Sequence, residues 1–147
     1  MNDRARPMEI LLVEDSPTDA DLAMRALQQG KLDNSVHHVR DGVEAMEFLR
    51  HEGDYASVPR PDLILLDLNM PRMDGREVLK AVRSDGNLKT IPVVVLTTSD
   101  DEPDVLAAYG LCSNAYIVKP VDVEQFFAIV KEIDQFWLRV VRLPDNH

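Results

Sequence analysis

Asp62-Leu63-Ile64-Leu65-Leu66-Asp67 is the stretch that decides the fold, because it joins four consecutive apolar residues to a terminal carboxylate. A short apolar run bounded by turn residues is typical of a strand that is buried on both faces of a sheet. In open α/β sheets, ligands bind in the crevice beyond the carboxyl ends of the strands. We therefore expect Asp67 at the edge where such folds do chemistry.

The length and composition predict one domain. A chain of 147 residues with 45% hydrophobic content fits a single globular core. No apolar run is long enough to span a membrane, and residues 1–8, which we expect to be flexible, lack the apolar region of a signal peptide. The single cysteine, Cys112, cannot form an internal disulfide, which agrees with a reducing compartment. We expect a cytoplasmic protein that does not associate with membranes.

The charge of the chain argues against nucleic-acid binding. Lysine and arginine number 16 against 26 acidic residues, which gives a formal net charge of −10. No segment is dense enough in lysine and arginine to follow a phosphate backbone. The acidic excess is better explained by a solvated surface together with a cluster of carboxylates that binds a cation.

Strand and helix patterns alternate five times along the chain. The other apolar runs that predict strands are Glu9–Val13, Ser35–Val39, Pro92–Leu96 and Ala115–Val118. Right-handed crossovers then produce a parallel sheet with helices on both faces. We predict a flavodoxin-like, doubly wound (βα)5 fold of the α/β class with strand order 2-1-3-4-5, in which the more polar second strand forms an edge.

Helix starts follow most of the predicted strands. Ser16 precedes Pro17 at the first helical position, and Asp19 favours the positive end of the helix dipole. Capping spacing recurs at Asp41-Gly42-Val43-Glu44 and at Asp74-Gly75-Arg76-Glu77. Further helices are expected from residue 100 to near Gly110 and, capped by Asp122, over residues 121–143 including an apolar extension. The last helix is longer and more apolar than one small sheet needs, so we predict that it forms a homodimer contact.

Two other features have alternative readings. The adjacent histidines His37 and His38 point to opposite faces of their strand, so a structural role is favoured over metal ligation. The segment from His51 to Arg60 is long for a connection between a helix and a strand, and a recognition role is one explanation for its length.

Four predicted strand ends carry polar side chains. These are Glu14 and Asp15, Asp67, Thr97 and Lys119. Crowded carboxylates repel one another unless they share protons or a metal, and oxygen ligands at this density suit Mg²⁺. An ionised Asp67 beside Mg²⁺ could attack phosphorus, with Lys119 supplying positive charge and Thr97 a hydrogen bond. Any one of these residues alone would be uninformative, and the inference comes from their combination.

These residues, together with Met70-Pro71, Asp74-Gly75 and Tyr116 before Lys119-Pro120, resemble the response-regulator receiver domain of two-component signalling. The resemblance extends from about Glu9 to Val141. It implies that Asp67 accepts a phosphoryl group from a sensor histidine kinase. It also implies Mg²⁺ ligation by Asp15, Asp67 and the backbone carbonyl of Asn69, with Glu14 close by.

The resemblance implies roles for further positions. Lys119 would pair with a phosphate oxygen and form a cis peptide bond with Pro120. Thr97 would move to hydrogen-bond the phosphate, and Tyr116 would turn inward as an aromatic switch. Asn69 and Ser99 would tune the lifetime of the aspartyl phosphate.

The long loop and the apolar C-terminal extension also resemble the small stand-alone regulators paired with bacterial phytochromes. That resemblance implies light signalling with a phytochrome kinase as partner, although the chain itself shows no chromophore site. Output would then go through protein contacts or onward phosphotransfer to a downstream partner.

Other functions stay open from the sequence. A Mg²⁺-dependent phosphatase that forms an aspartyl phosphate places a second acid two residues beyond the nucleophile, where this chain has Asn69. A phosphorelay intermediate and an adaptor whose acids merely bind a cation are further alternatives. We expect a phosphoacceptor signalling protein rather than an enzyme with external turnover.

Overall fold

The computed structural model describes residues 7–29, 33–68, 70, 72–97, 115–119, 122, 124–125 and 128. Five strands form one sheet in the order β2-β1-β3-β4-β5, and every neighbouring pair is parallel. The strands are β1 (Met8–Val13), β2 (Asn34–Val39), β3 (Leu63–Asp67), β4 (Val93–Thr97) and β5 (Ala115–Val118). The predicted parallel sheet and strand order are therefore confirmed.

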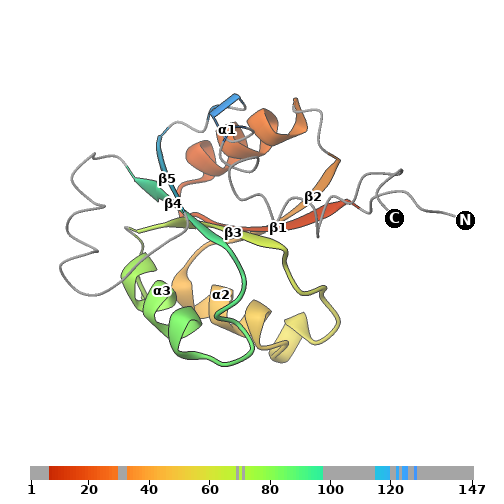
Figure 1. The fold of residues 1–147 in the computed structure, drawn as a ribbon, viewed down its shortest axis with the longest axis vertical. Helices are drawn as coiled ribbons and strands as arrows, with labels where there is room; N and C mark the ends of the chain where they lie inside the picture. The colour runs from red at the N-terminus through yellow and green to blue at the C-terminus, as the bar shows by residue number, and fades with distance from the viewer. Residues whose placement is uncertain are drawn as a thin grey trace, which may run out of the picture.

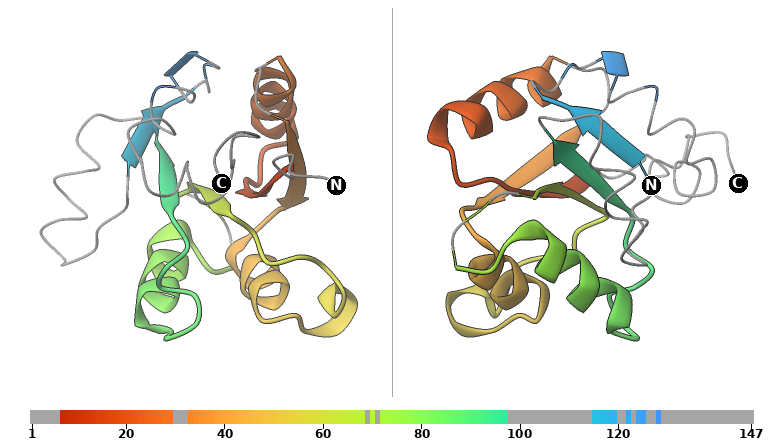
Figure 2. Two further views of the ribbon diagram at one scale, coloured as in Figure 1. Left: turned by 45° about the vertical axis from the view of Figure 1, so that its right-hand side comes forward. Right: turned by 90° about the vertical axis from the view of Figure 1, so that its left-hand side faces the viewer.

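Helices cover both faces of this sheet. Helix α1 (Pro17–Gln28) lies on one face, and α2 (Gly42–Leu49) and α3 (Gly75–Ser84) lie on the other (Figures 1 and 2). A short 3₁₀ helix, η1 (Gly53–Tyr55), lies within the long segment after α2. The layers are those expected for the α/β class.

Both faces of the central strands are buried, which explains why their sequences show no alternation of apolar and polar residues. In β1, Ile10 and Leu12 pack in the cluster that contains residues of α1, and Leu11 and Val13 pack in the cluster that contains α2 and α3. All four side chains are fully buried. The outer strand β2 is only partly buried over most of its length, as its polar sequence predicts.

Capping side chains begin the helices at the predicted positions. Asp74 and Glu77 form a complete capping box, in which each side chain accepts a hydrogen bond from the other residue's N–H. Asp41 accepts from the N–H of Glu44 at 2.9 Å, but the Glu44 carboxylate accepts from Arg40 rather than from Asp41. Further caps are made by Ser16, which accepts from Asp19, and by Asp122, which accepts from Glu124.

Some boundaries differ from the prediction. Met8, expected in the flexible start, is instead the first residue of β1, because its N–H donates to the carbonyl of Asp33 and its side chain is fully buried. Strand β4 begins at Val93 rather than Pro92, which lacks an N–H to donate, and extends to Thr97.

Other predictions lie outside the described residues. These are the flexibility of residues 1–6, the helix from residue 100 to Gly110 and the extent of the helix over 121–143. Within this last range, Glu124, Gln125 and Ala128 are described and are helical. Within the described part of the chain, no helix combines the length and apolar character that crossing a membrane requires.

Gly75, the first residue of α3, brings that helix close to the end of β3. Its N–H donates to the carbonyl of Leu68 at 2.9 Å. A Cβ atom at this position would clash with the carbonyl oxygen of Asp67 and would lie 2.6 Å from the Cα atom of Leu68. Both neighbours are backbone atoms of the segment that holds Asp67, so they cannot move aside without displacing it.

We predict that Gly75→Ala lowers the free energy of unfolding by about 1–3 kcal/mol, the usual cost of forcing an extra methyl group into a packed site. Gly86→Ala is the matched control, because nothing lies within 4 Å of the Cβ it would introduce. Urea denaturation at constant m-value measures both. Equal stability of the two variants would contradict the close approach.

Candidate functional site

The parallel register brings four strand ends to one edge of the sheet. Asp67, the last residue of β3, pairs with Leu96, and Thr97, the last residue of β4, pairs with Val118. Glu14 directly follows β1 and Lys119 directly follows β5. Parallel strands place their carboxyl ends at the same edge, so residues as far apart in sequence as Glu14 and Lys119 meet there.

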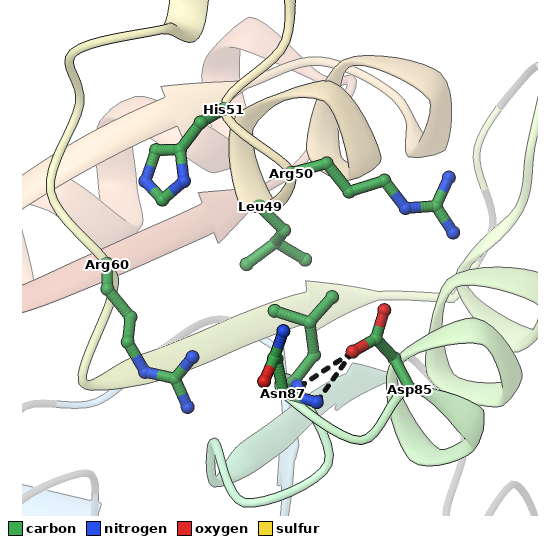
Figure 3. Close-up of a pocket in the computed structure, with 7 residues that line it drawn as sticks. Leu49, Arg50, His51, Arg60, Asp85 and Asn87 are labelled. Carbon is green, nitrogen blue, oxygen red and sulfur yellow. Dashed lines mark hydrogen bonds between the residues drawn. The ribbon is translucent and has the colours of Figure 1, made fainter.

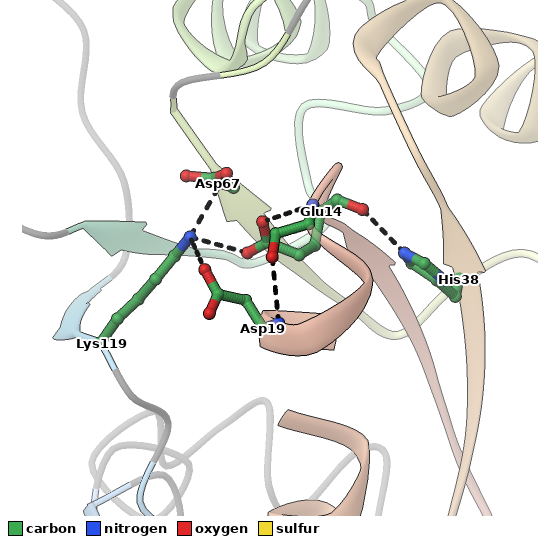
Figure 4. A network of polar contacts seen from close by, with 6 residues as sticks. Glu14, Asp19, His38, Asp67 and Lys119 are labelled. Carbon is green, nitrogen blue, oxygen red and sulfur yellow. Dashed lines mark hydrogen bonds and ion pairs between the residues drawn. The ribbon is translucent and has the colours of Figure 1, made fainter. Parts of the chain in front are cut away.

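Lys119 is the centre of the charged cluster at this edge (Figure 4). Its Nζ atom lies 2.8 Å from Glu14 Oε1, 3.3 Å from Asp19 Oδ2 and 3.4 Å from Asp67 Oδ2. The backbone N–H of Lys119 also donates to the backbone carbonyl of Thr97 at 2.8 Å, which fixes the position of Lys119 directly after β5. One ammonium group thus compensates carboxylates from β3, from α1 and from the end of β1.

Glu14, Asp15 and Asp67 form a compact set of oxygen donors. Each contributes a carboxylate oxygen, and these atoms lie within 4.8 Å of one another. Glu14 and Asp67 are buried and Asp15 is half-buried. Clustered carboxylate oxygens are the ligands of hard divalent cations, so the residues present fit such an ion.

Burial dominates the ionisation of Glu14. Desolvation raises the pKa of this carboxyl to about 7, the hydrogen bond from Lys119 opposes the rise, and the charge of Asp67 adds to it. The pKa of Lys119 is also raised: burial would lower it, but the hydrogen bond with Glu14 and the charges of Asp67 and Glu14 outweigh burial. Lys119 therefore stays charged, and Glu14 is only partly ionised near neutral pH.

Asp19 belongs to this cluster, although its sequence position predicted only a role at the helix dipole. Its carboxylate contacts Lys119 while its N–H donates to Ser16 Oγ. A signal for this position exists in the sequence. Because α1 begins three residues after Glu14, the first turn of the helix must lie at the same edge as the acids.

The two histidines have the predicted structural contacts. His37 Nε2 lies 2.7 Å from Glu9 Oε1, and the His37 ring is 5.5 Å from the ring of Phe48. His38 Nε2 lies 2.7 Å from the backbone carbonyl of Glu14. His38 thus supports the backbone that holds the acid pair.

The other predicted site residues divide into two groups. Thr97 is buried at the edge with Asp67 and Lys119, and Tyr116 in β5 is partly buried against the core cluster of α2 and α3. The predicted site residues that lie outside the described part of the chain are Asn69, Ser99 and Pro120. The roles implied for all of these positions remain predictions.

A separate cavity of about 320 Å³ lies at the opposite edge, where the strands begin (Figure 3). Its lining comes from the end of α2, the long segment after it and the connection before β4, namely Leu49, Arg50, His51, Arg60, Asp85, Asn87 and Leu88. The cavity shares no residue with the acid cluster. It does not extend the candidate site, and a recognition role for the long segment remains a prediction.

The sequence matches a known protein family over most of its length. Residues 10–131 match the response regulator receiver domain family. The chain belongs to the response regulator receiver family. The resemblance found from the strand-end residues is therefore confirmed. The matched segment begins within β1, at Ile10, and contains every residue of the charged cluster.

Some relatives match this chain over nearly the whole length of both proteins. The response regulator Rcp1 of Synechocystis sp. is 48% identical over 145 residues, which cover 98% of this chain and 99% of Rcp1. A Mn²⁺-bound form of Rcp1 has been solved, and it matches 94% of this chain and 99% of that one with a TM-score of 0.72.

Two further solved relatives are phytochrome response regulators. The phosphorylated cyanobacterial regulator RcpA is 51% identical, with a TM-score of 0.74 over 95% of this chain and 100% of that one. The bacteriophytochrome response regulator RtBRR is 44% identical, with a TM-score of 0.83 over 96% and 86% of the two chains. This receiver is therefore homologous to phytochrome response regulators.

The raised pKa of Glu14 predicts a pH-dependent stability of the metal-free receiver. The folded state binds the proton of the Glu14 carboxyl more tightly than the unfolded chain does. The resulting contribution to the free energy of unfolding is fully present below about pH 4.5 and is lost as pH rises through about 7. Glu14→Gln cannot ionise. Its stability relative to wild type should therefore rise by a few kcal/mol across that window, as one pKa unit corresponds to about 1.4 kcal/mol.

Urea unfolding in the presence of a chelator, repeated from pH 4.5 to 8, measures this difference. Glu47→Gln, an exposed glutamate on α2, is the control and should show little dependence on pH. A Glu14→Gln difference that stays flat across the window would show that Glu14 ionises normally in the fold.

Proposed function

We propose that this receiver is a phosphoacceptor signalling protein in which Asp67 takes a phosphoryl group from a histidine kinase with the help of Mg²⁺. The observation that carries the proposal is the position of Asp67. Its carboxylate lies 3.4 Å from the Lys119 ammonium and within the oxygen cluster formed with Glu14 and Asp15. A nucleophilic carboxylate beside a fixed cation and a divalent-ion site is the arrangement that phosphoryl transfer requires.

Each residue of the cluster has a role in this proposal. Asp15, Asp67 and the backbone carbonyl of Asn69 would hold Mg²⁺, and Glu14 would stay close to the ion. When bound, the ion supplies positive charge that neutralises phosphoryl oxygens. An oxygen of Asp67 forms a bond to phosphorus as the bond from phosphorus to the histidine nitrogen breaks, and the released imidazole takes up a proton.

Lys119 would exchange partners during the reaction. In the structure its ammonium is shared among three carboxylates, with the shortest contact to Glu14. A phosphoryl group on Asp67 brings a more concentrated negative charge to the same place, so Lys119 would pair with a phosphate oxygen. Thr97 would then hydrogen-bond the phosphate, Tyr116 would turn inward, and Ser99 and Asn69 would set the phosphate lifetime.

The proposed kinase is a phytochrome. The support comes from relatives that are themselves phytochrome response regulators and match this chain over nearly its whole length. Output would pass to a downstream protein or to a further phosphotransfer partner. The proposal keeps the expected cytoplasmic location, which agrees with a chain whose single cysteine cannot form an internal disulfide.

The alternative is a Mg²⁺-dependent phosphatase that uses the same aspartyl phosphate. Asn69 disfavours it, because an amide cannot serve as the general acid that such an enzyme needs two residues after its nucleophile. The two functions differ in turnover: a regulator acquires one labile phosphate per chain, whereas an enzyme releases phosphate continuously from many phosphoesters.

We predict that acetyl phosphate with Mg²⁺ adds one hydroxylamine-labile phosphate per wild-type chain and that Asp67→Asn abolishes this labelling. The side-chain amide of that variant is a far weaker nucleophile than a carboxylate. Asp54→Asn, an exposed acid in η1, is the matched control and should label as wild type does. Intact-protein mass spectrometry before and after hydroxylamine treatment gives the stoichiometry.

Labelling of Asp67→Asn at the wild-type level would contradict the proposal and favour a cation-binding adaptor. Sustained release of inorganic phosphate from several phosphoesters by the wild type would favour the phosphatase.

The proposed homodimer through the helix expected over 121–143 has its own test. The apolar residues Phe126, Val130, Ile133 and Trp137 recur at helical spacing there. We predict that the mass measured by light scattering rises from monomer to dimer with concentration and that replacing Phe126 and Ile133 by polar residues shifts this transition to higher concentration. A wild type that stays monomeric with and without phosphorylation would contradict the dimer.

A further inference from the structure

The loop between Asp67 and helix α3 is attached to the start of α2. The carbonyl of Met73 accepts a hydrogen bond from the N–H of Gly42 at 3.0 Å. A Cβ atom at Gly42 would clash with that carbonyl and would lie 2.7 Å from the Cβ atom of Met73, so the two segments are in close backbone contact. At the base of the loop, the N–H of Gly75 donates to the carbonyl of Leu68.

An ion pair adds a third attachment. The Nε atom of Arg72 donates to Asp41 Oδ2 at 2.8 Å, and the Nη2 atom of Arg72 donates to Asp41 Oδ1 at 3.0 Å. Such two-point pairing fixes the orientation of the guanidinium group as well as its distance. The carboxylate side of the pair is mostly buried, with 11% of the Asp41 side chain exposed.

Arg72 holds a backbone conformation that a residue with a side chain adopts at a cost. Its φ angle is +65°, in the left-handed region, where a non-glycine residue loses about 1–2 kcal/mol. Glycine at this position would remove the strain but could not make the contact with Asp41. The two hydrogen bonds to Asp41 offset that strain.

Asp41 also begins α2. Its Oδ1 atom accepts the N–H of Glu44 as the cap of the helix while it accepts Arg72. Burial raises the pKa of this carboxyl, but the hydrogen bond from Glu44 and the contacts with Arg72 outweigh burial and hold the pKa below its usual range. Asp41 is thus kept ionised in the position that receives Arg72.

We propose that Arg72 and Asp41 are positioning residues for the phosphoacceptor site: their ion pair clamps the loop after Asp67 to α2 and thereby sets the affinity of the site for Mg²⁺. This inference rests on the proposed function, in which the carbonyl of Asn69 is a ligand. In sequence, Asn69 lies between Leu68 and Arg72, two of the points at which the loop is attached. Releasing Arg72 leaves the loop freer and makes ion binding bear the cost of ordering it.

Isothermal titration with Mg²⁺ alone tests the clamp without any phosphoryl transfer. Arg72→Ala should weaken Mg²⁺ binding about tenfold, the lower end of the loss seen when a partner that orients a metal ligand is removed. Arg25→Ala is the matched control, because it also breaks an arginine–aspartate pair, with Asp21 at 3.0 Å, but on the exposed surface of α1. Its Mg²⁺ affinity should equal that of wild type.

Further variants separate positioning from stability. Asp41→Ser keeps a capping oxygen for α2 but removes the ion pair. It should weaken Mg²⁺ binding as Arg72→Ala does, and the double variant should be no weaker than either single one. Arg72→Gly relieves the backbone strain, so it should recover stability relative to Arg72→Ala while its Mg²⁺ affinity stays low.

The outcomes also separate this inference from the proposed function. Arg72→Ala that lowers the unfolding temperature but binds Mg²⁺ as tightly as wild type would overturn the clamp and leave the proposed function intact. Wild type that binds no Mg²⁺ at millimolar concentrations would overturn the proposed function itself, and the clamp with it.

Discussion

The structure depends on the balance of charge at the carboxyl edge of the sheet. Glu14 and Asp67 are almost completely buried, and ionised carboxylates in such positions are costly unless a cation lies beside them. Lys119 supplies that cation from the far end of the sequence, with its ammonium within 3.4 Å of both groups. Burial raises the pKa of Glu14 to about 7 despite Lys119, and the clustered oxygens of Glu14, Asp15 and Asp67 fit a second cation.

The topology makes this balance achievable. Strand order β2-β1-β3-β4-β5 places β1 next to β3, and their paired residues Val13 and Leu66 directly precede Glu14 and Asp67. The apolar strands, buried on both faces, anchor those ends rigidly. Among the described residues of the loop after Asp67, Met70 and Met73 are only partly buried and Arg72 is exposed, and the contacts with Gly42 and Asp41 attach this part of the chain to α2.

Much of this arrangement was accessible from sequence because it depends on local patterns. Apolar runs such as Ile64 to Leu66 predict buried strands, and the carboxylate, hydroxyl or ammonium group directly after four of these runs predicts the composition of the edge. Contacts that depend on the path of a loop were not accessible. The pairing of Arg72 with Asp41, across 31 positions, requires a left-handed residue that no local pattern indicates. The contact between Asp19 and Lys119 was not predictable for a different reason: a favourable position at the positive end of the α1 dipole already accounts for an acid there, and no local pattern requires a second partner.

The central claim is that Asp67, Lys119 and the acids after β1 converge on a single phosphoryl group. A crystal structure of the protein with Mg²⁺ and beryllium trifluoride, a mimic of the phosphoryl group, tests this claim most directly. We expect beryllium bonded to an oxygen of Asp67, Mg²⁺ in contact with Asp15 and Asp67, and the Lys119 ammonium moved from Glu14 to a fluoride. Beryllium bound elsewhere, or a Lys119 side chain directed away from the adduct, would contradict it.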